Sequence, residues 1–233
     1  FKRRAQEIVA LSEKTKRDFI RGNRELSGEI GIGCGEFRSI QIIAQIMKEF
    51  KKEHPFVTFQ IYSGNSSNIK ERIESGILDI GVILDYVDIR KYEYVRIPLS
   101  EEWGVLVRED SPLAAMEYVT PEDIRELPLI ISERSMRDNE LADWIGKKYE
   151  DLNIVSTYNL MYNAAIMVAN GMGVAGCIKL DCRYEGTRFV PARPSVKNNS
   201  VFAWKKALSQ SQAVSSFIEF SRIYIKRISS NTT

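Results

Sequence analysis

The stretch Leu26–Phe50, LSGEIGIGCGEFRSIQIIAQIMKEF, reads as a strand, a tight loop of small residues and a helix. Ile30 and Ile32 alternate with other residues, which is typical of a strand. Small residues around Gly35 let the backbone turn sharply, and from Ser39 onward apolar residues recur at helical spacing. A strand that feeds a helix N-terminus presents unpaired N–H groups and the positive end of the helix dipole. In an open α/β sheet, ligands bind at this edge.

The following residues repeat this unit. Val57–Tyr62 is predicted to be a strand, and a polar loop at 63–68 can cap a helix at Ile69–Ser75. Asp79–Leu84 ends in a continuous apolar run, as expected for a strand covered on both faces of its sheet. The order is therefore β-α-β-α-β over Leu26–Leu84, which predicts a parallel sheet.

A second α/β region is predicted after this sheet. Two separate strands are expected at Tyr94–Leu99 and Trp103–Arg108. Further strands are expected at Leu129–Ser132, Ile154–Tyr158, Val174–Ile178, Arg188–Pro191 and Ser200–Lys205, with helices at Thr120–Ile124, Asn139–Lys148, Ala164–Asn170 and Gln212–Ile228. The last strand has no predicted partner nearby, and the terminal helix needs a core to pack on. Both are therefore expected to return to the first region.

The composition excludes several classes of protein. The chain has 233 residues, 44% of them hydrophobic and 27% charged, which is the ordinary globular range. A formal net charge of +2 does not indicate an electrostatic nucleic-acid binder, and no apolar run reaches the length of a membrane span. The three cysteines have no metal-like spacing and indicate a reducing compartment. We therefore expect a cytoplasmic protein with no membrane partner.

The N-terminal segment Phe1–Arg24 has the pattern of a single helix. Its apolar residues form a narrow stripe surrounded by Lys and Arg, and the segment carries too much charge for a secretory signal peptide. Two interpretations remain open: an amphipathic helix that lies on the body of the protein, or the end of a coiled-coil linker to an upstream segment. The chain does not begin with Met, so we interpret it as part of a longer protein.

Several motifs, taken in order, resemble one family. They are LSGEIGIG, FKKEHPFVTFQIYSGNSSNIKERIESGILDIGVI, SEEWGVLVREDSPLA, LPLIISERS and VANGMGVAGCI. Together they are similar to the effector-binding domain of LysR-type transcriptional regulators, and they cover nearly the whole chain. The charged N-terminal helix also fits, because members of this family join a winged helix-turn-helix domain to the effector-binding domain through a long helix.

The resemblance implies a periplasmic-binding-protein type 2-like α/β fold. Two Rossmann-like subdomains would be joined by two crossover strands, near Leu99–Ser100 and Lys197–Ser200, with a ligand cleft between the subdomains. The implied organisation is a linker helix at 1–25, subdomain I at 26–98 plus 199–233, and subdomain II at 99–198.

The resemblance also implies a function. A small polar or carboxylate-bearing effector would bind in the cleft, and DNA would be bound only by an N-terminal domain absent from this chain. The domains would form a homodimer, with a tetramer as the alternative in the full-length protein. In the dimer, Ile40–Phe50 would pack against Asn139–Lys148 of the partner.

The start of the first helix departs from the family pattern. Many members carry Ser or Thr at the start of the first helix, where this chain has Cys34, Gly35 and Glu36. The Glu36 carboxylate is expected to occupy the positive terminus of that helix and to oppose an anionic ligand.

The candidate ligand-binding residues lie at predicted strand ends and helix starts. They are Cys34, Gly35, Glu36, Ser63, Asn65, Ser66, Ser100, Glu101, Ser132, Arg134, Ser135 and Asn163. Hydroxyls, backbone N–H groups and an arginine suit a small carboxylate-bearing or polar metabolite. The alternative is that these residues are ordinary polar loop residues and helix caps.

No catalytic constellation is found in the sequence. His54 is the only histidine, and no metal-ligand cluster or phosphate-binding P-loop is present, so neither an enzyme nor a cofactor is predicted. Cys177 and Cys182 are close in sequence, and both an inert and a redox role are considered. The alternative functions are a solute-binding receptor of a transporter and an enzyme on the same two-subdomain fold, such as a dehydratase or deaminase.

Overall fold

The computed structural model describes residues 26–84, 89–133, 140–206 and 210–230, together with Ala5, Ile8, Val9 and Ser12. Most of the predicted N-terminal helix therefore lies outside the described residues. The chain forms two compact units. The first unit contains Phe1–Gly35, Ser39–Leu99 and Asn199–Thr233, and the second contains Glu36–Arg38 and Ser100–Asn198.

The first unit is built on a mixed sheet. Strand β1 (Ser27–Cys34) pairs in parallel with β2 (Phe56–Ser63) on one side and with β3 (Ile80–Leu84) on the other. Strand β9 (Lys197–Lys205) runs antiparallel beside β3 and returns the end of the chain to this unit. The parallel β-α-β-α-β order predicted for Leu26–Leu84 is confirmed.

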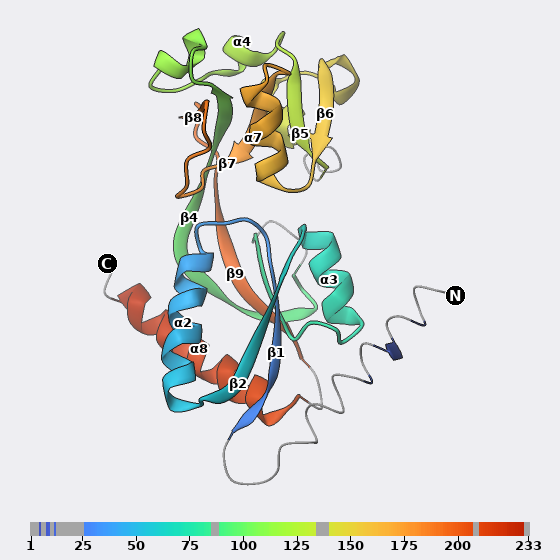
Figure 1. Ribbon diagram of the computed structural model, residues 1–233, viewed down its shortest axis with the longest axis vertical. Coiled ribbons are helices and arrows are strands. Elements are labelled where there is room, and N and C mark those ends of the chain that lie inside the picture. The colour runs from blue at the N-terminus through green and yellow to red at the C-terminus, as the bar shows by residue number, and fades with distance from the viewer. Residues whose placement is uncertain are drawn as a thin grey trace. The chain divides into compact units, whose positions relative to one another are not determined.

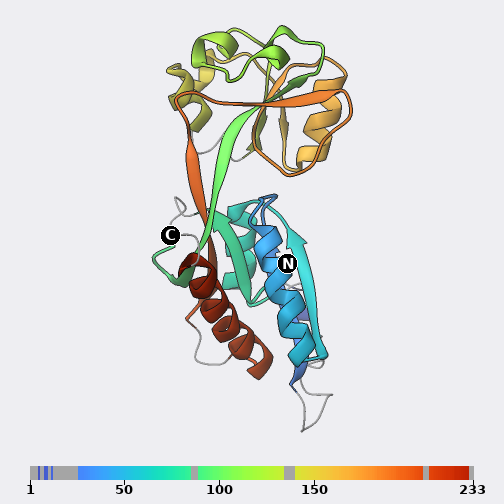
Figure 2. The same cartoon turned by 90° about the vertical axis from the view of Figure 1, so that its left-hand side faces the viewer.

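One face of this sheet is covered by α2 (Ile40–Glu53) and α8 (Gln212–Ser230), which lie next to each other (Figures 1 and 2). An aromatic cluster joins the two helices. The ring of Phe217 on α8 lies 5.1 Å from that of Phe50 on α2 and 4.9 Å from that of Phe59 on β2, measured between centroids. This burial explains why the terminal helix needs the first sheet as its core.

The opposite face carries α3 (Ser66–Glu74) at close range (Figure 1). Gly33 points towards this helix, and a Cβ atom there would lie 2.8 Å from a methyl carbon of Ile69. Such a separation is well inside van der Waals contact, so the helix can approach only a glycine. The small residues of the GEIGIG segment therefore serve helix packing as well as the turn.

The second unit has its own mixed sheet. Strand β4 (Tyr92–Arg108) enters it from the first unit and pairs antiparallel with β7 (Val174–Ile178) and β8 (Thr187–Pro191). Strand β5 (Leu129–Ser132) lies parallel to β7 and to the outer strand β6 (Ile154–Tyr158). Short helices η1 (Pro112–Ala115), α4 (Pro121–Ile124) and η2 (Tyr149–Asp151) occupy the connections.

Alternate residues of these strands point to opposite faces of the sheet and pack into two separate hydrophobic cores. On one face, Leu106, Ile130 and Cys177 pack with α7 (Met161–Ala169). On the other face, the neighbouring strand residues pack with α6 (Glu140–Ile145) and with the segments around α4. Period-two burial on both faces is the pattern expected of a covered sheet.

Two predicted strands are in fact one. The polar residues after Leu99 indicated a break between Tyr94–Leu99 and Trp103–Arg108, whereas β4 continues through them. The break was predicted wrongly because Glu101, although acidic, is fully buried, and its carboxylate accepts a hydrogen bond from the backbone N–H of Arg38. A buried carboxylate is tolerated where such donors satisfy it.

Helix boundaries also differ from the predictions. α7 begins at Met161, three residues earlier than predicted, and α3 begins at Ser66, also three residues earlier. α6 ends at Ile145 instead of continuing to Lys148, because Gly146 has a φ of +72° and terminates the helix.

Candidate functional site

The polar edge of the first unit lies at the carboxyl ends of its parallel strands. Cys34 is the register partner of Ser63, so β1 and β2 end side by side. The N–H of Gly64 donates to the Cys34 carbonyl at 3.1 Å, and the N–H of Gly35 donates to the Val82 carbonyl at 3.4 Å. The strand register and these hydrogen bonds place Ser63, Gly64 and Val82 beside Cys34 and Gly35. Cys34 is 3% exposed, whereas Ser63 is exposed.

The start of α3 completes this edge. Asn65 is the N-cap, and its side-chain oxygen accepts from the backbone N–H of Asn68 at 2.9 Å. Ser66 was predicted to lie in a polar loop, but it is the first residue of α3 and only 5% exposed. The capping bond accounts for Asn65 without a ligand, because an N-cap side chain satisfies an otherwise unpaired helix donor.

Glu36 lies in the second unit. Its carboxylate accepts a hydrogen bond from the backbone N–H of Met161 at 2.6 Å, at the first residue of α7. The prediction that it occupies the N-terminus of the first helix was therefore wrong, since it occupies that of a helix 125 residues further along. This contact explains the early start of α7, because Leu160 supplies no side-chain cap. Asn163 does not open the helix but is an exposed residue in its first turn.

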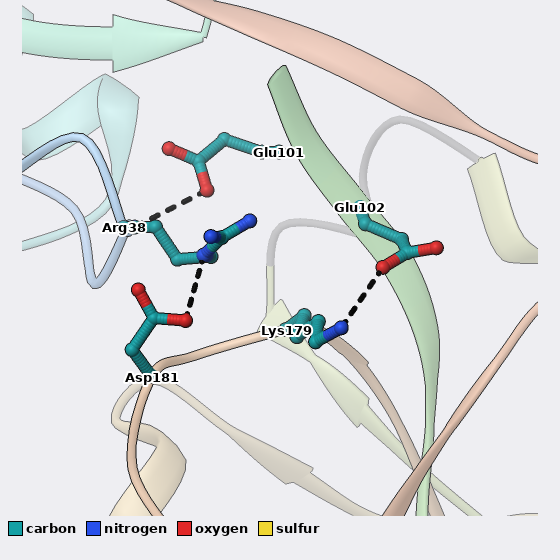
Figure 3. A network of polar contacts seen from close by, with 5 residues as sticks. All are labelled: Arg38, Glu101, Glu102, Lys179 and Asp181. Atoms are coloured by element: carbon teal, nitrogen blue, oxygen red, sulfur yellow. Dashed lines mark hydrogen bonds and ion pairs between the residues drawn. The ribbon is translucent and has the colours of Figure 1, made fainter. Parts of the chain in front are cut away.

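A polar network surrounds Arg38 (Figure 3). Its backbone N–H donates to the Glu101 carboxylate at 3.2 Å, and its Nε lies 2.9 Å from Oδ1 of Asp181. Beside it, Nζ of Lys179 lies 3.3 Å from the carboxylate of Glu102. Both ion pairs are partly exposed, so each contributes roughly 0–1 kcal/mol and mainly fixes local geometry.

Sequence patterns do not predict most members of this network. Only Glu101 was selected, and Ser100 beside it is exposed on β4. Arg38 and Asp181 are 143 residues apart, and nothing in the local sequence pattern links them. The one sequence feature that points to this network is the acidic pair Glu101 and Glu102, which follows a predicted strand.

Ser132 marks the carboxyl edge of the second sheet. It is the last residue of β5, half-buried, and its register partner is Tyr158 on β6. Arg134 and Ser135 lie outside the described residues, so their predicted roles stay predictions.

The hydroxyl of Tyr158 donates to the Gly176 carbonyl at 2.8 Å. Burial, with the nearby Cys177 and Glu36, raises the pKa of Tyr158 well above its usual value, so it remains a neutral donor.

The thiols differ in environment. Burial raises the pKa of Cys177 to about 12, which keeps it protonated and unreactive at neutral pH. Cys182 is exposed. Burial raises the pKa of the Tyr184 phenol, and a hydrogen bond with Cys182 raises it further.

Within the ranges that the structure describes, no group of three or more His, Cys, Asp or Glu residues is arranged to hold a metal ion. None of the described helices has the length and apolar character needed to cross a membrane.

The chain belongs to a known family. The family model of the LysR substrate binding domain matches residues 23–224. The prediction from the sequence motifs is therefore confirmed, and the members of this family are transcriptional regulators and not enzymes. The alternative of a transporter receptor is not favoured.

Relatives by sequence are regulators. The chain is 32% identical over 150 residues to the uncharacterized HTH-type transcriptional regulator YwqM of Bacillus subtilis (strain 168), covering 61% of this chain and 50% of that protein. It is 23% identical over 148 residues to the uncharacterized regulator YvbU of the same organism, covering 64% of this chain and 49% of that protein. The chain thus spans about half the length of the curated relatives that it matches.

Solved structures confirm the fold. The effector binding domain of QuiR in complex with shikimate superposes with a TM-score of 0.74 at 18% identity, covering 87% of this chain and 99% of that one. HinK, a LysR family transcriptional regulator from Pseudomonas aeruginosa, matches with a TM-score of 0.65 at 20% identity, covering 96% of this chain and 80% of that one. The predicted periplasmic-binding-protein type 2-like α/β fold is confirmed.

Proposed function

We propose that this chain senses a small effector for a LysR-type transcriptional regulator. The match of the family model to residues 23–224 carries this proposal. An N-terminal winged helix-turn-helix domain, outside this chain, would bind DNA, and the whole protein would act in the cytoplasm. The effector regulates only if it binds one conformation of the domain more tightly than another, since a ligand of equal affinity shifts no equilibrium.

The effector is proposed to bind at the polar edges of the two units. The first unit offers the hydroxyl groups of Ser63 and Ser66, and the second unit offers that of Ser132. Hydroxyl groups suit a polar or carboxylate-bearing metabolite, the class to which the shikimate bound by QuiR belongs. The Glu36 carboxylate disfavours an anionic ligand at the N-terminus of α7, because it already accepts the hydrogen bond from the Met161 N–H there.

A thermal-melt screen of the chain against shikimate, amino acids and small carboxylic acids tests the proposal. A ligand at about 100 times its dissociation constant adds about 2.7 kcal/mol to the free energy of unfolding, equivalent to several degrees for a chain of this size. The melting temperature should rise with ligand concentration.

Two serines in neighbouring strands provide a matched pair for the screen. Ser132→Ala removes a hydroxyl at the carboxyl edge and should reduce the ligand-induced shift, whereas Ser156→Ala within β6 should preserve it. An equal reduction by both variants would contradict the placement of the site. No shift with any compound of the panel would count against a small-molecule effector.

We further propose that the domain dimerises through α2 and α6, with a tetramer as the alternative in the full-length protein. The chain alone is expected not to bind DNA, which an electrophoretic mobility assay beside the full-length regulator would check. Binding of DNA by the isolated chain would contradict the proposal that only the N-terminal domain binds DNA.

A further inference from the structure

The second unit contains a cavity to which the proposed function assigns no role. It has a volume of about 1050 Å³ and lies between strands β4, β7 and β8 and the segment 179–186. Pockets for small molecules commonly measure roughly 300–1,000 Å³. The cavity is therefore large enough for an organic ligand.

One part of the cavity lining belongs to a hydrophobic core. Leu106, Met161 and Cys177 line the cavity, and all three belong to the buried cluster beneath α7. The rings of Tyr184 and Phe189 also line it and are only partly buried against that cluster. Aromatic rings and sulfur atoms together favour a flat aromatic ligand, through ring–ring and sulfur–ring contacts.

The wall of the cavity is held in place by hydrogen bonds. The backbone N–H of Lys179 donates to the Glu102 carbonyl at 2.8 Å, and the Asp181 side chain pairs with Arg38 (Figure 3). The Thr187 hydroxyl donates to the Tyr184 carbonyl at 2.9 Å. The first two contacts attach the connection to other segments of the unit and the third fixes its end, so the wall is preformed, which lowers the entropic cost of binding.

The positive and negative side chains that line the cavity are equal in number. The lining includes three cations, Lys179, Arg183 and Arg188, and three carboxylates, Glu109, Asp181 and Glu185. A lining of equal and opposite charge gives no net attraction to an ion of either sign, which favours a ligand without net charge.

We propose that this cavity is a second small-molecule site and that it takes a planar aromatic compound without net charge. The proposal does not depend on the effector site at the strand edges, since it rests on the cavity and its lining alone.

Isothermal titration of the chain with indole is the direct test, with indole-3-acetate and tryptamine as charged counterparts. Indole should bind more tightly than either. Tyr184→Ala removes one aromatic wall and should weaken indole binding roughly tenfold. Tyr118→Ala is the matched control, because this ring is 42% exposed in the same unit and does not line the cavity.

Cys182→Trp provides a second variant at an exposed lining position, where a bulky side chain should block entry without disturbing the core. It keeps the test valid if Tyr184→Ala does not fold. Absence of indole binding, or an affinity that Cys182→Trp leaves unchanged, would overturn the site. Tighter binding of either charged compound would overturn the assigned ligand class.

Discussion

Gly104 lies where β4 is paired on both sides, with Cys177 of β7 and Pro191 of β8. A Cβ atom at this position would overlap the Val190 carbonyl oxygen and the ring of Phe189. Backbone cannot move aside as a flexible side chain can, so the position demands glycine for steric reasons.

Gly104→Ala is therefore expected to destabilise the chain by more than about 2 kcal/mol. Gly176→Ala in the neighbouring strand is the control, because its new Cβ would meet only Leu141, at 3.4 Å, an ordinary contact. Urea unfolding of both variants measures the difference. Similar midpoints for the two would contradict the steric argument.

The buried thiol of Cys177 predicts an alkaline loss of stability. The folded state keeps the thiol proton up to a pKa of about 12, whereas the unfolded chain loses it near 9.0. The folded state then binds more protons than the unfolded state above about pH 9, so the free energy of unfolding falls by up to about 1.4 kcal/mol per pH unit.

Between about pH 9 and 10, Cys177→Ala should flatten this slope, although it lowers the starting stability through the lost side chain. Cys182→Ala, at an exposed position, should retain the slope. Urea unfolding across this pH range provides the measurement. Equal slopes in wild type and Cys177→Ala would exclude the thiol as the cause.

At the scale of elements, α3 illustrates how one side chain sets a helix boundary. Asn65 accepts from the Asn68 N–H and so lets the helix begin at Ser66. The polar run before Ile69 indicated that a cap lies here, but several residues in it can act as caps.

Asn65→Ala should cost about 1 kcal/mol of stability, because the cap is lost. Asn65→Asp keeps a side-chain acceptor and should cost much less. Differential scanning calorimetry of the two variants compares them directly. A loss in Asn65→Asp as large as in Asn65→Ala would show that the cap is not the cause.

α7 shows the opposite case, in which a distant residue sets the boundary. Its first N–H is satisfied by Glu36, which precedes α2 in the sequence. No local motif marks this start, since Leu160 is not a capping residue. The predicted start at Ala164 followed local pattern alone and therefore came three residues late.

At the scale of the whole molecule, the proposed dimer makes a mutational prediction. Ala44 is exposed on α2, the helix proposed to face the partner. Ala44→Arg should shift the chain from dimer to monomer, because a buried unpaired charge is costly at an interface.

Ser215→Arg on α8 is the control, since it places the same charge at an exposed position of a helix outside the proposed interface. Sedimentation equilibrium reports the mass of each variant. A monomeric wild-type chain at high concentration, or equal dissociation by both variants, would count against the interface.

The sequence was most informative where structure depends on neighbours along the chain. Alternating apolar residues, glycine turns and helical spacing were sufficient to predict the strands and helices of Leu26–Leu84 and their parallel pairing. The family motifs, spread over nearly the whole chain, were sufficient for the class of protein. These signals are local, and burial requirements repeat with the period of each element.

The tertiary structure decided what depends on residues far apart in the sequence. It placed Glu36 on the first residue of α7, carried β4 unbroken past the buried Glu101, and joined Arg38 to Asp181. It also formed the cavity of the second unit. Each of these features depends on residues that are far apart in the sequence and meet only on folding, so no local sequence pattern predicts it.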